Sequence, residues 1–138
     1  MDTKDKIMLV FIASFVDVCV IYSMMNLDLS YTDWLWNIVV LISHSTFYYA
    51  IRIYSKNLID KLHYLVFILP LFSVFLDSVF LKTVVLVHML IIQILWIKEN
   101  RCIMNEKNDV KFGYGNELSI ATLIFNLFLA FNIGYSLK

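Results

Sequence analysis

The sequence predicts an all-α integral membrane protein in which five transmembrane helices form one bundle, a single membrane domain over residues 1–138. Of its 138 residues, 61% are hydrophobic and 16% are charged, which is more apolar side chain than the core of a soluble domain of this size can bury. The apolar residues gather into runs long enough to cross about 30 Å of hydrocarbon as helices. These runs cover residues 7–25, 34–54, 62–80, 82–97 and 118–136.

The first run, residues 7–25, follows Lys4 and Lys6 in the way that a signal peptide follows its basic start. However, it is too long for a signal peptide, contains Asp17 and lacks a cleavage site of small residues. We therefore predict that it is retained as the first helix.

The second run, residues 34–54, carries a stripe of mostly polar residues. Its members follow one another at steps of four, three, four and four residues, which places them on one side of a helix. The stripe consists of Asn37, Leu41, His44, Tyr48 and Arg52. This side of the helix is predicted to face protein rather than lipid.

Residues 62–97 form an apolar run that is too long for one crossing at 1.5 Å per residue. Its only polar interruption extends from Asp77 to Lys82. We therefore predict a tight turn there, which joins the helices over 62–80 and 82–97 into a hairpin. The helix over 82–97 is the shortest span, and it fits the membrane only if the Lys82 side chain extends to the surface.

The fifth run, residues 118–136, carries a helix-packing stripe of small and polar residues. Four of its five members follow at spacings of four, the pattern that lets helix backbones approach closely. The stripe consists of Ser119, Thr122, Asn126, Ala130 and Gly134. The predicted partners are therefore the lipid bilayer and either further copies of this chain or other membrane helices.

The positions of lysine and arginine predict the orientation, because cytoplasmic loops hold most of these residues. With the N terminus in the cytoplasm, only Lys82 and Lys138 lie on the other side. The cytoplasmic set is Lys4, Lys6, Arg52, Lys56, Lys61, Lys98, Arg101, Lys107 and Lys111. A four-span arrangement would place the loops that carry Lys56 and Lys98 on opposite sides. We therefore predict five crossings, with the C terminus opposite the N terminus.

The tripeptide Gly113-Tyr114-Gly115 matches the centre of potassium-channel selectivity filters. In those filters the carbonyl groups and a threonine hydroxyl replace the hydration of the ion, but here Lys111 stands at the threonine position. The tripeptide also lies in a loop predicted to be cytoplasmic, whereas potassium-channel filters re-enter from outside. The glycines are better explained by a turn, after which Asn116 caps the fifth helix.

Counted from the centres of the spans, one residue of each helix lies near a common depth: Asp17, His44, Pro70, His88 and Asn126. An ionised aspartate at the bilayer centre costs about 3 kcal/mol, so Asp17 must be protonated, paired or hydrated. His44, at the same depth, is its predicted partner, and such a pair could bind and release a proton near neutral pH. The alternative is that these side chains only hold helices together, by hydrogen bonds worth about 1 kcal/mol or less each.

We find no catalytic or cofactor motif in the sequence, which predicts a protein without enzymatic activity and without a metal or other cofactor. Acidic and basic residues are equal in number, so nothing draws the chain to nucleic acid. Cys19 and Cys102 form neither a disulfide framework nor a zinc site. One alternative remains, since His44 and His88 lie at similar depth on two helices, as the axial ligands of a b-type haem do.

The segment HMLIIQILWIKENRCIMNE, residues 88–106, resembles a pattern in small uncharacterised multi-span membrane proteins of giant DNA viruses. In that pattern an apolar helix with a histidine runs into Trp, then Asn, then Cys followed by an aliphatic residue. The matching positions are His88, Trp96, Asn100, Cys102 and Ile103. The resemblance implies a viral or virus-infected-cell membrane and carries no activity.

Two functions fit these features. The first is a non-enzymatic membrane component or assembly partner that associates through the stripe on the fifth helix. The alternative is a small channel or transporter that moves protons or a small solute past Asp17 and His44.

Overall fold

The computed structural model describes residues 3–99 and 117–138. Over these residues the chain forms α-helices and no strand, which confirms the predicted all-α fold. The helices are α1 (Thr3–Asn26), α2 (Tyr31–Arg52), α3 (Lys56–Phe72), α4 (Val79–Glu99) and α5 (Glu117–Ser136), and a short 3₁₀ helix, η1 (Ser73–Phe75), follows α3.

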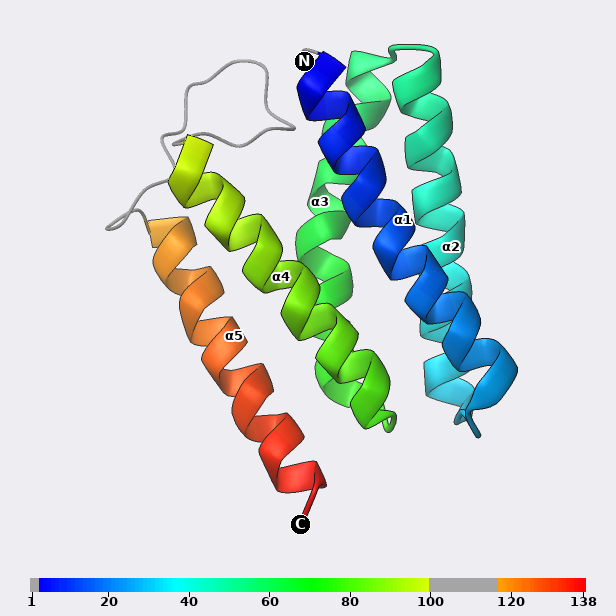
Figure 1. Cartoon of the computed structure of the whole chain (residues 1–138), viewed down its shortest axis with the longest axis vertical. Helices are drawn as coiled ribbons and strands as arrows, with labels where there is room; N and C mark the ends of the chain where they lie inside the picture. Colours follow the sequence, from blue (N-terminus) through cyan, green and yellow to red (C-terminus); the bar gives the residue numbers. More distant parts are fainter. Residues whose placement is uncertain (1–2, 100–116) are drawn as a thin grey trace.

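Consecutive helices run in opposite directions along the long axis of the molecule, so the two termini lie at opposite ends of the bundle (Figure 1). Helix α1 packs against α2 and α4, and α3 packs against α2. Helix α5 lies at the edge of the bundle, where it packs mainly against α4. The first four helices therefore enclose the interior, and α5 is added to the outside of α4.

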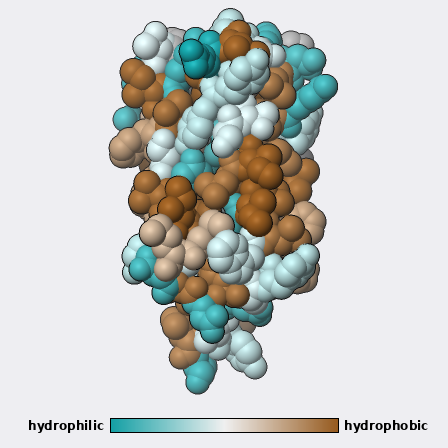
Figure 2. All heavy atoms as spheres, turned by 90° about the vertical axis from the view of Figure 1, so that its right-hand side faces the viewer, coloured by the Kyte–Doolittle hydropathy of each residue, from teal (hydrophilic) through white to brown (hydrophobic). Residues whose placement is uncertain are grey.

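Within the described residues, four helical segments are long and apolar enough to cross a membrane: Thr3–Asn26, Lys56–Phe75, Val79–Glu99 and Ser119–Ser136. On the face shown in Figure 2, hydrophobic residues gather in the middle and hydrophilic residues towards both ends. These features fit a membrane protein.

Helix α2, the predicted second span, is long enough with its 22 residues but does not belong to these four. Its polar stripe is the physical reason. Buried Asn37 and partly buried His44 and Tyr48 lower its average hydropathy while they face neighbouring helices.

The third helix differs most from its predicted range of 62–80, since it begins at Lys56 and continues through η1 only to Phe75. Its polar first turns are amphipathic, and Ile59 is buried there. The helix therefore extends beyond the apolar run that the sequence shows. Near the other end, the Ser73 N–H bonds to the Pro70 carbonyl instead of continuing the α-helical pattern. The predicted turn between the third and fourth helices follows at residues 76–78.

The tighter end of α3 gives it a hydrogen bond to α2. A regular α-helix would direct the Ser73 N–H to the Leu69 carbonyl. That carbonyl instead accepts a hydrogen bond from Trp36 Nε1, at 3.1 Å. The buried Trp36 indole therefore joins α2 to the last turn of α3.

Asp33 fixes the turn between α3 and α4 to the start of α2. Ser30 and Asp33 form a capping box, in which the Ser30 N–H donates to Asp33 Oδ2 at 3.2 Å. Asp33 Oδ1 accepts from the backbone N–H groups of Asp77 and Ser78, at 3.0 and 3.3 Å. Because Asp33 is 1% exposed, its carboxylate is held at the end of the bundle by backbone donors from two segments.

Candidate functional site

The structure brings Asp17 of α1 and His44 of α2 together. Asp17 Oδ1 lies 2.6 Å from His44 Nδ1, and each side chain is 17% exposed. Both residues lie near the middle of their helices, and α1 and α2 pack side by side in opposite directions (Figure 1). Asp17, the acidic residue of the predicted midplane layer, thus has the His44 imidazole as its direct partner.

Tyr48 supplies a second donor to the same carboxylate. Its hydroxyl donates to Asp17 Oδ2 at 2.6 Å, and Ser14 Oγ lies 3.3 Å from that hydroxyl. Tyr48 follows His44 by four residues and Ser14 precedes Asp17 by three, so each pair shares one face of its helix. The sequence places Tyr48 in the stripe of the second helix, but the stripe alone does not connect it with Asp17.

This arrangement can hold a proton without leaving a net positive charge. When His44 is neutral and donates its Nδ1–H to Asp17, its Nε2 is an acceptor. Protonation of Nε2 then gives an ion pair between the imidazolium and the carboxylate. Because both oxygens of Asp17 have a donor, the ionised form of the carboxylate is stabilised inside the bundle.

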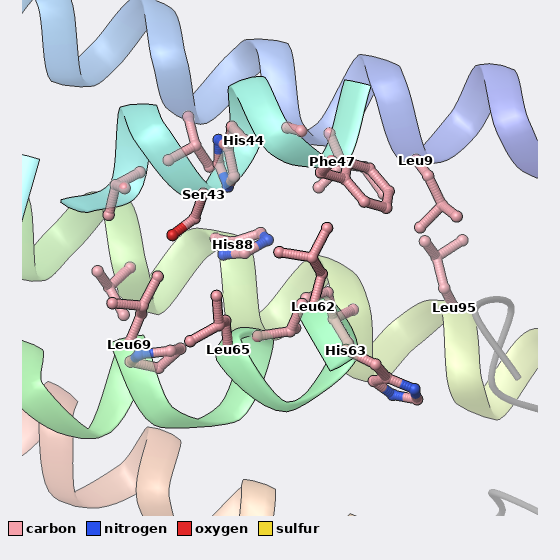
Figure 3. Close-up of a pocket in the computed structure, with 18 of the residues that line it drawn as sticks. Leu9, Ser43, His44, Phe47, Leu62, His63, Leu65, Leu69, His88 and Leu95 are labelled. Carbon is pink, nitrogen blue, oxygen red and sulfur yellow. The ribbon is translucent and has the colours of Figure 1, made fainter. Parts of the chain in front are cut away.

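A partly open cavity of about 100 Å³ adjoins the pair on the His44 side, and α1, α2, α3 and α4 all contribute to its lining. The lining is mainly apolar, but it includes His44, His63 and His88, which are all three histidines of the chain. Figure 3 shows the His88 ring close to His44, in the space between α2 and α3, and the His63 ring directed away from it. Within the described residues, no three potential ligands lie close enough together to hold a metal ion.

The five residues of the predicted layer divide between two places. His44, His88 and Pro70 line the cavity, and Asp17 is bonded to His44. Pro70 lies in the last turn of α3 rather than at its middle, because the helix ends earlier than predicted, at Phe72.

The fifth member of that layer, Asn126, lies between α4 and α5. Its Nδ2 donates to Gln93 Oε1 at 2.9 Å, and Gln93 Nε2 donates to the Ser119 carbonyl at 3.3 Å. Asn126 and Gln93 are both buried. The structure therefore makes Asn126 part of the α4–α5 contact and separates it from the cavity.

The helix-packing stripe of the fifth helix also divides. Ser119, Thr122 and Asn126 are buried, whereas Ala130 and Gly134 are exposed. No atom of the described chain lies within 4 Å of the position that a Cβ of Gly134 would take. Residues four apart differ by about 40° in direction around a helix, so the stripe turns away from α4 along its length.

Lys82 lies on the same α4–α5 contact, near the opposite end from Ser119. The prediction that its side chain extends to the membrane surface differs from the structure, where Lys82 is 6% exposed and donates to Asn132 Oδ1 at 2.7 Å. The neighbouring α5 provides this acceptor within reach, so the ammonium group is held between the helices.

The fold and the site together define a helical bundle with membrane-spanning properties and an ionisable pair beside an interior cavity. A comparison of the chain with protein-family models, curated proteins and solved structures finds no match. The resemblance to viral multi-span proteins therefore stays a prediction. Several of the residues named for that resemblance and for the filter match lie outside the described residues, namely Asn100, Cys102, Ile103, Lys111 and Gly113 to Asn116.

Proposed function

We propose that this protein is a small proton-binding channel or transporter of a membrane, in which the Asp17–His44 pair takes up and releases the proton. The observation that carries the proposal is the 2.6 Å contact between Asp17 and His44 beside the cavity. Ionisable residues inside membrane segments are costly, and those that persist commonly mark proton or ion pathways. The Tyr48 hydroxyl supports the same role, because it holds the carboxylate in position.

The proposed topology has five crossings, with the N terminus in the cytoplasm. It is supported by the alternating directions of the helices and by the termini at opposite ends (Figure 1). Described lysine and arginine residues also gather at the N-terminal end of the bundle, at the ends of α1, α2, α3 and α4. Helix α2 crosses as the least apolar span, because α1 and α3 cover its polar side chains.

The topology is tested with reporter tags at the two ends of the chain. Tags that report from opposite compartments are the expected result. If both tags report from the same compartment, the crossing number is even and the proposed orientation of the site is wrong.

Proton movement is tested with the purified chain in lipid vesicles that contain a pH-sensitive dye. Asp17→Asn keeps the shape of the side chain but removes its charge, and with it a charge-assisted hydrogen bond worth about 1.5–3 kcal/mol. We expect a pH-driven flux in the wild type that falls about tenfold or more in this variant.

Asp28→Asn is the matched control, because Asp28 is an exposed acid in the loop between α1 and α2. Its flux is expected to stay within about twofold of the wild type, as for a surface substitution. Equal flux in the wild type, Asp17→Asn and Asp28→Asn would rule out a role of the pair in transport.

A membrane component that assembles through α5 is the second candidate. It is favoured by the position of α5 at the edge of the bundle, where Ala130 and Gly134 face outwards with exposed apolar residues such as Phe128 and Phe131. This candidate predicts that Gly134→Leu disrupts oligomers, whereas Asp17→Asn leaves assembly intact. The proton-pathway candidate predicts that Asp17→Asn abolishes flux and that Gly134→Leu matters less.

A further inference from the structure

His88 is a partly buried titratable group that the Asp17–His44 pair does not use directly. It lies at the middle of α4 and lines the cavity together with His44 (Figure 3). Over residues 3–99 and 117–138, its ring has no hydrogen-bond partner. A neutral imidazole has one donor and one acceptor, and an imidazolium has two donors, so a water in the cavity would supply the missing partner.

The cavity has room for that water. A single water needs about 10–15 Å³ of such volume and two to four polar partners, whereas the cavity measures about 100 Å³. Two further polar groups line the cavity with His88, namely Nε2 of His44 and the Ser43 hydroxyl. The Ser43 hydroxyl donates to the Val39 carbonyl at 2.7 Å, so its oxygen can still accept a hydrogen bond. The other walls are mainly apolar, so water that enters the cavity would find its polar partners near the two rings.

The charges around the cavity favour one proton rather than two. Among the described residues, the titratable ones in the lining are His44, His63 and His88. Asp17 is the carboxylate bonded to His44, and Tyr48 donates to that carboxylate. His44 and His88 lie close together in the cavity lining, so positive charges on both rings would repel each other, and Asp17 can neutralise only one of them. The two rings therefore compete for a single proton.

We propose that His88 is the second proton-accepting group of the site, and that water in the cavity carries the proton between His44 and His88. The imidazolium of His44 gives its Nε2 proton to a water, and that water gives one of its protons to a ring nitrogen of His88. His44 is left neutral, with its Nδ1–H donated to Asp17, and one positive charge has moved from α2 to α4. No bond other than N–H and O–H bonds changes. This inference rests on the proposed function, since the proton enters through the Asp17–His44 pair.

The first test does not require transport. The chain contains three histidines, so ¹⁵N-histidine labelling gives three ring systems, which single substitutions assign. His44→Gln removes the competing charge, and the protonation of His88 is expected to move to higher pH by about half a unit, a roughly threefold change in proton affinity. His63→Gln is the matched control, because its ring points away from His88 (Figure 3), and it is expected to leave the His88 titration in place.

The same spectra test the water. A cross-peak between water and the His88 ring is expected in the wild type. Its absence, or an unchanged His88 titration in His44→Gln, overturns the inference. If His44→Gln does not fold, Asp17→Asn replaces it. This variant removes the carboxylate that favours the proton on His44, so the protonated share of His88 is expected to rise relative to His44, and no rise overturns the inference.

The second test measures flux in vesicles and separates this inference from the proposed function. His88→Gln is expected to lower the flux about tenfold, while the exposed-site control Asp28→Asn keeps it within about twofold. Wild-type flux that survives in His88→Gln overturns the role of His88 but leaves the proposed function standing. If the wild type shows no flux, the proposed function fails, and the titration alone decides whether His44 and His88 share a proton.

Discussion

Replacing Asp33 tests whether one carboxylate holds α2 to the turn between α3 and α4. Asp33→Ala removes the acceptor of three backbone N–H groups, from Ser30, Asp77 and Ser78. A hydrogen bond to a charged group contributes about 1.5–3 kcal/mol, and a lost capping residue costs about 1 kcal/mol. Since the donors lie at the end of the bundle, where some can rebind water, the expected loss in the free energy of unfolding is about 3–5 kcal/mol. Asp33→Asn keeps one accepting oxygen and is expected to lose about 1–2 kcal/mol.

The assay is unfolding in detergent micelles, followed by circular dichroism as heat or a denaturing detergent is applied. Asp28→Ala provides the control, because Asp28 is exposed and lies just before the capping box. Its expected effect is within about 0.5 kcal/mol of zero. If Asp33→Ala is as stable as Asp28→Ala, the Asp33 hydrogen bonds do not hold this end of the bundle together.

Three further predictions concern the contacts between helices. Asn126→Ala removes the hydrogen-bond donor of buried Gln93 and should weaken the packing of α5 on α4 by about 0.5–1.5 kcal/mol. The rate of proteolysis between α4 and α5 measures this loss, and an unchanged rate contradicts the prediction. Gly134→Leu should leave the melting temperature of the isolated chain unchanged, because the position faces open space, and a clear fall would show that it packs inside the bundle. Trp36→Phe deprives the Leu69 carbonyl of its donor and should cost about 1 kcal/mol in the same melting experiment; a loss near zero would show that water replaces the indole.

The sequence predicts the helices because apolar runs and their interruptions are local features. It predicts helix ends less well, as the third helix shows. The polar stretch from Lys56 to Lys61 looks like a loop when only hydrophobicity is considered, yet it is the amphipathic start of α3. The helix also ends earlier than predicted, at Phe72, which places Pro70 in its last turn instead of at its centre.

The candidate site follows from the sequence only where periodicity and depth agree. Both criteria point to Asp17 and His44, which the structure brings to 2.6 Å. Position along the membrane normal alone places Asn126 in the same layer. That criterion does not tell which neighbouring helix a side chain faces, and Asn126 faces Gln93 of α4. The role of Asp33 could not be predicted, because its donors come from a turn 44 and 45 residues further along the chain.

The position of α5 at the edge of the bundle affects the order in which the parts of the fold are completed during synthesis. Every described residue that lines the cavity comes from α1 to α4, and α5 is attached mainly through its contacts with α4. A chain cut after α4 therefore keeps every described side chain around the two imidazoles. These side chains are all present before the last helix is synthesised, whereas the core of the bundle gains the buried Leu129 only with α5.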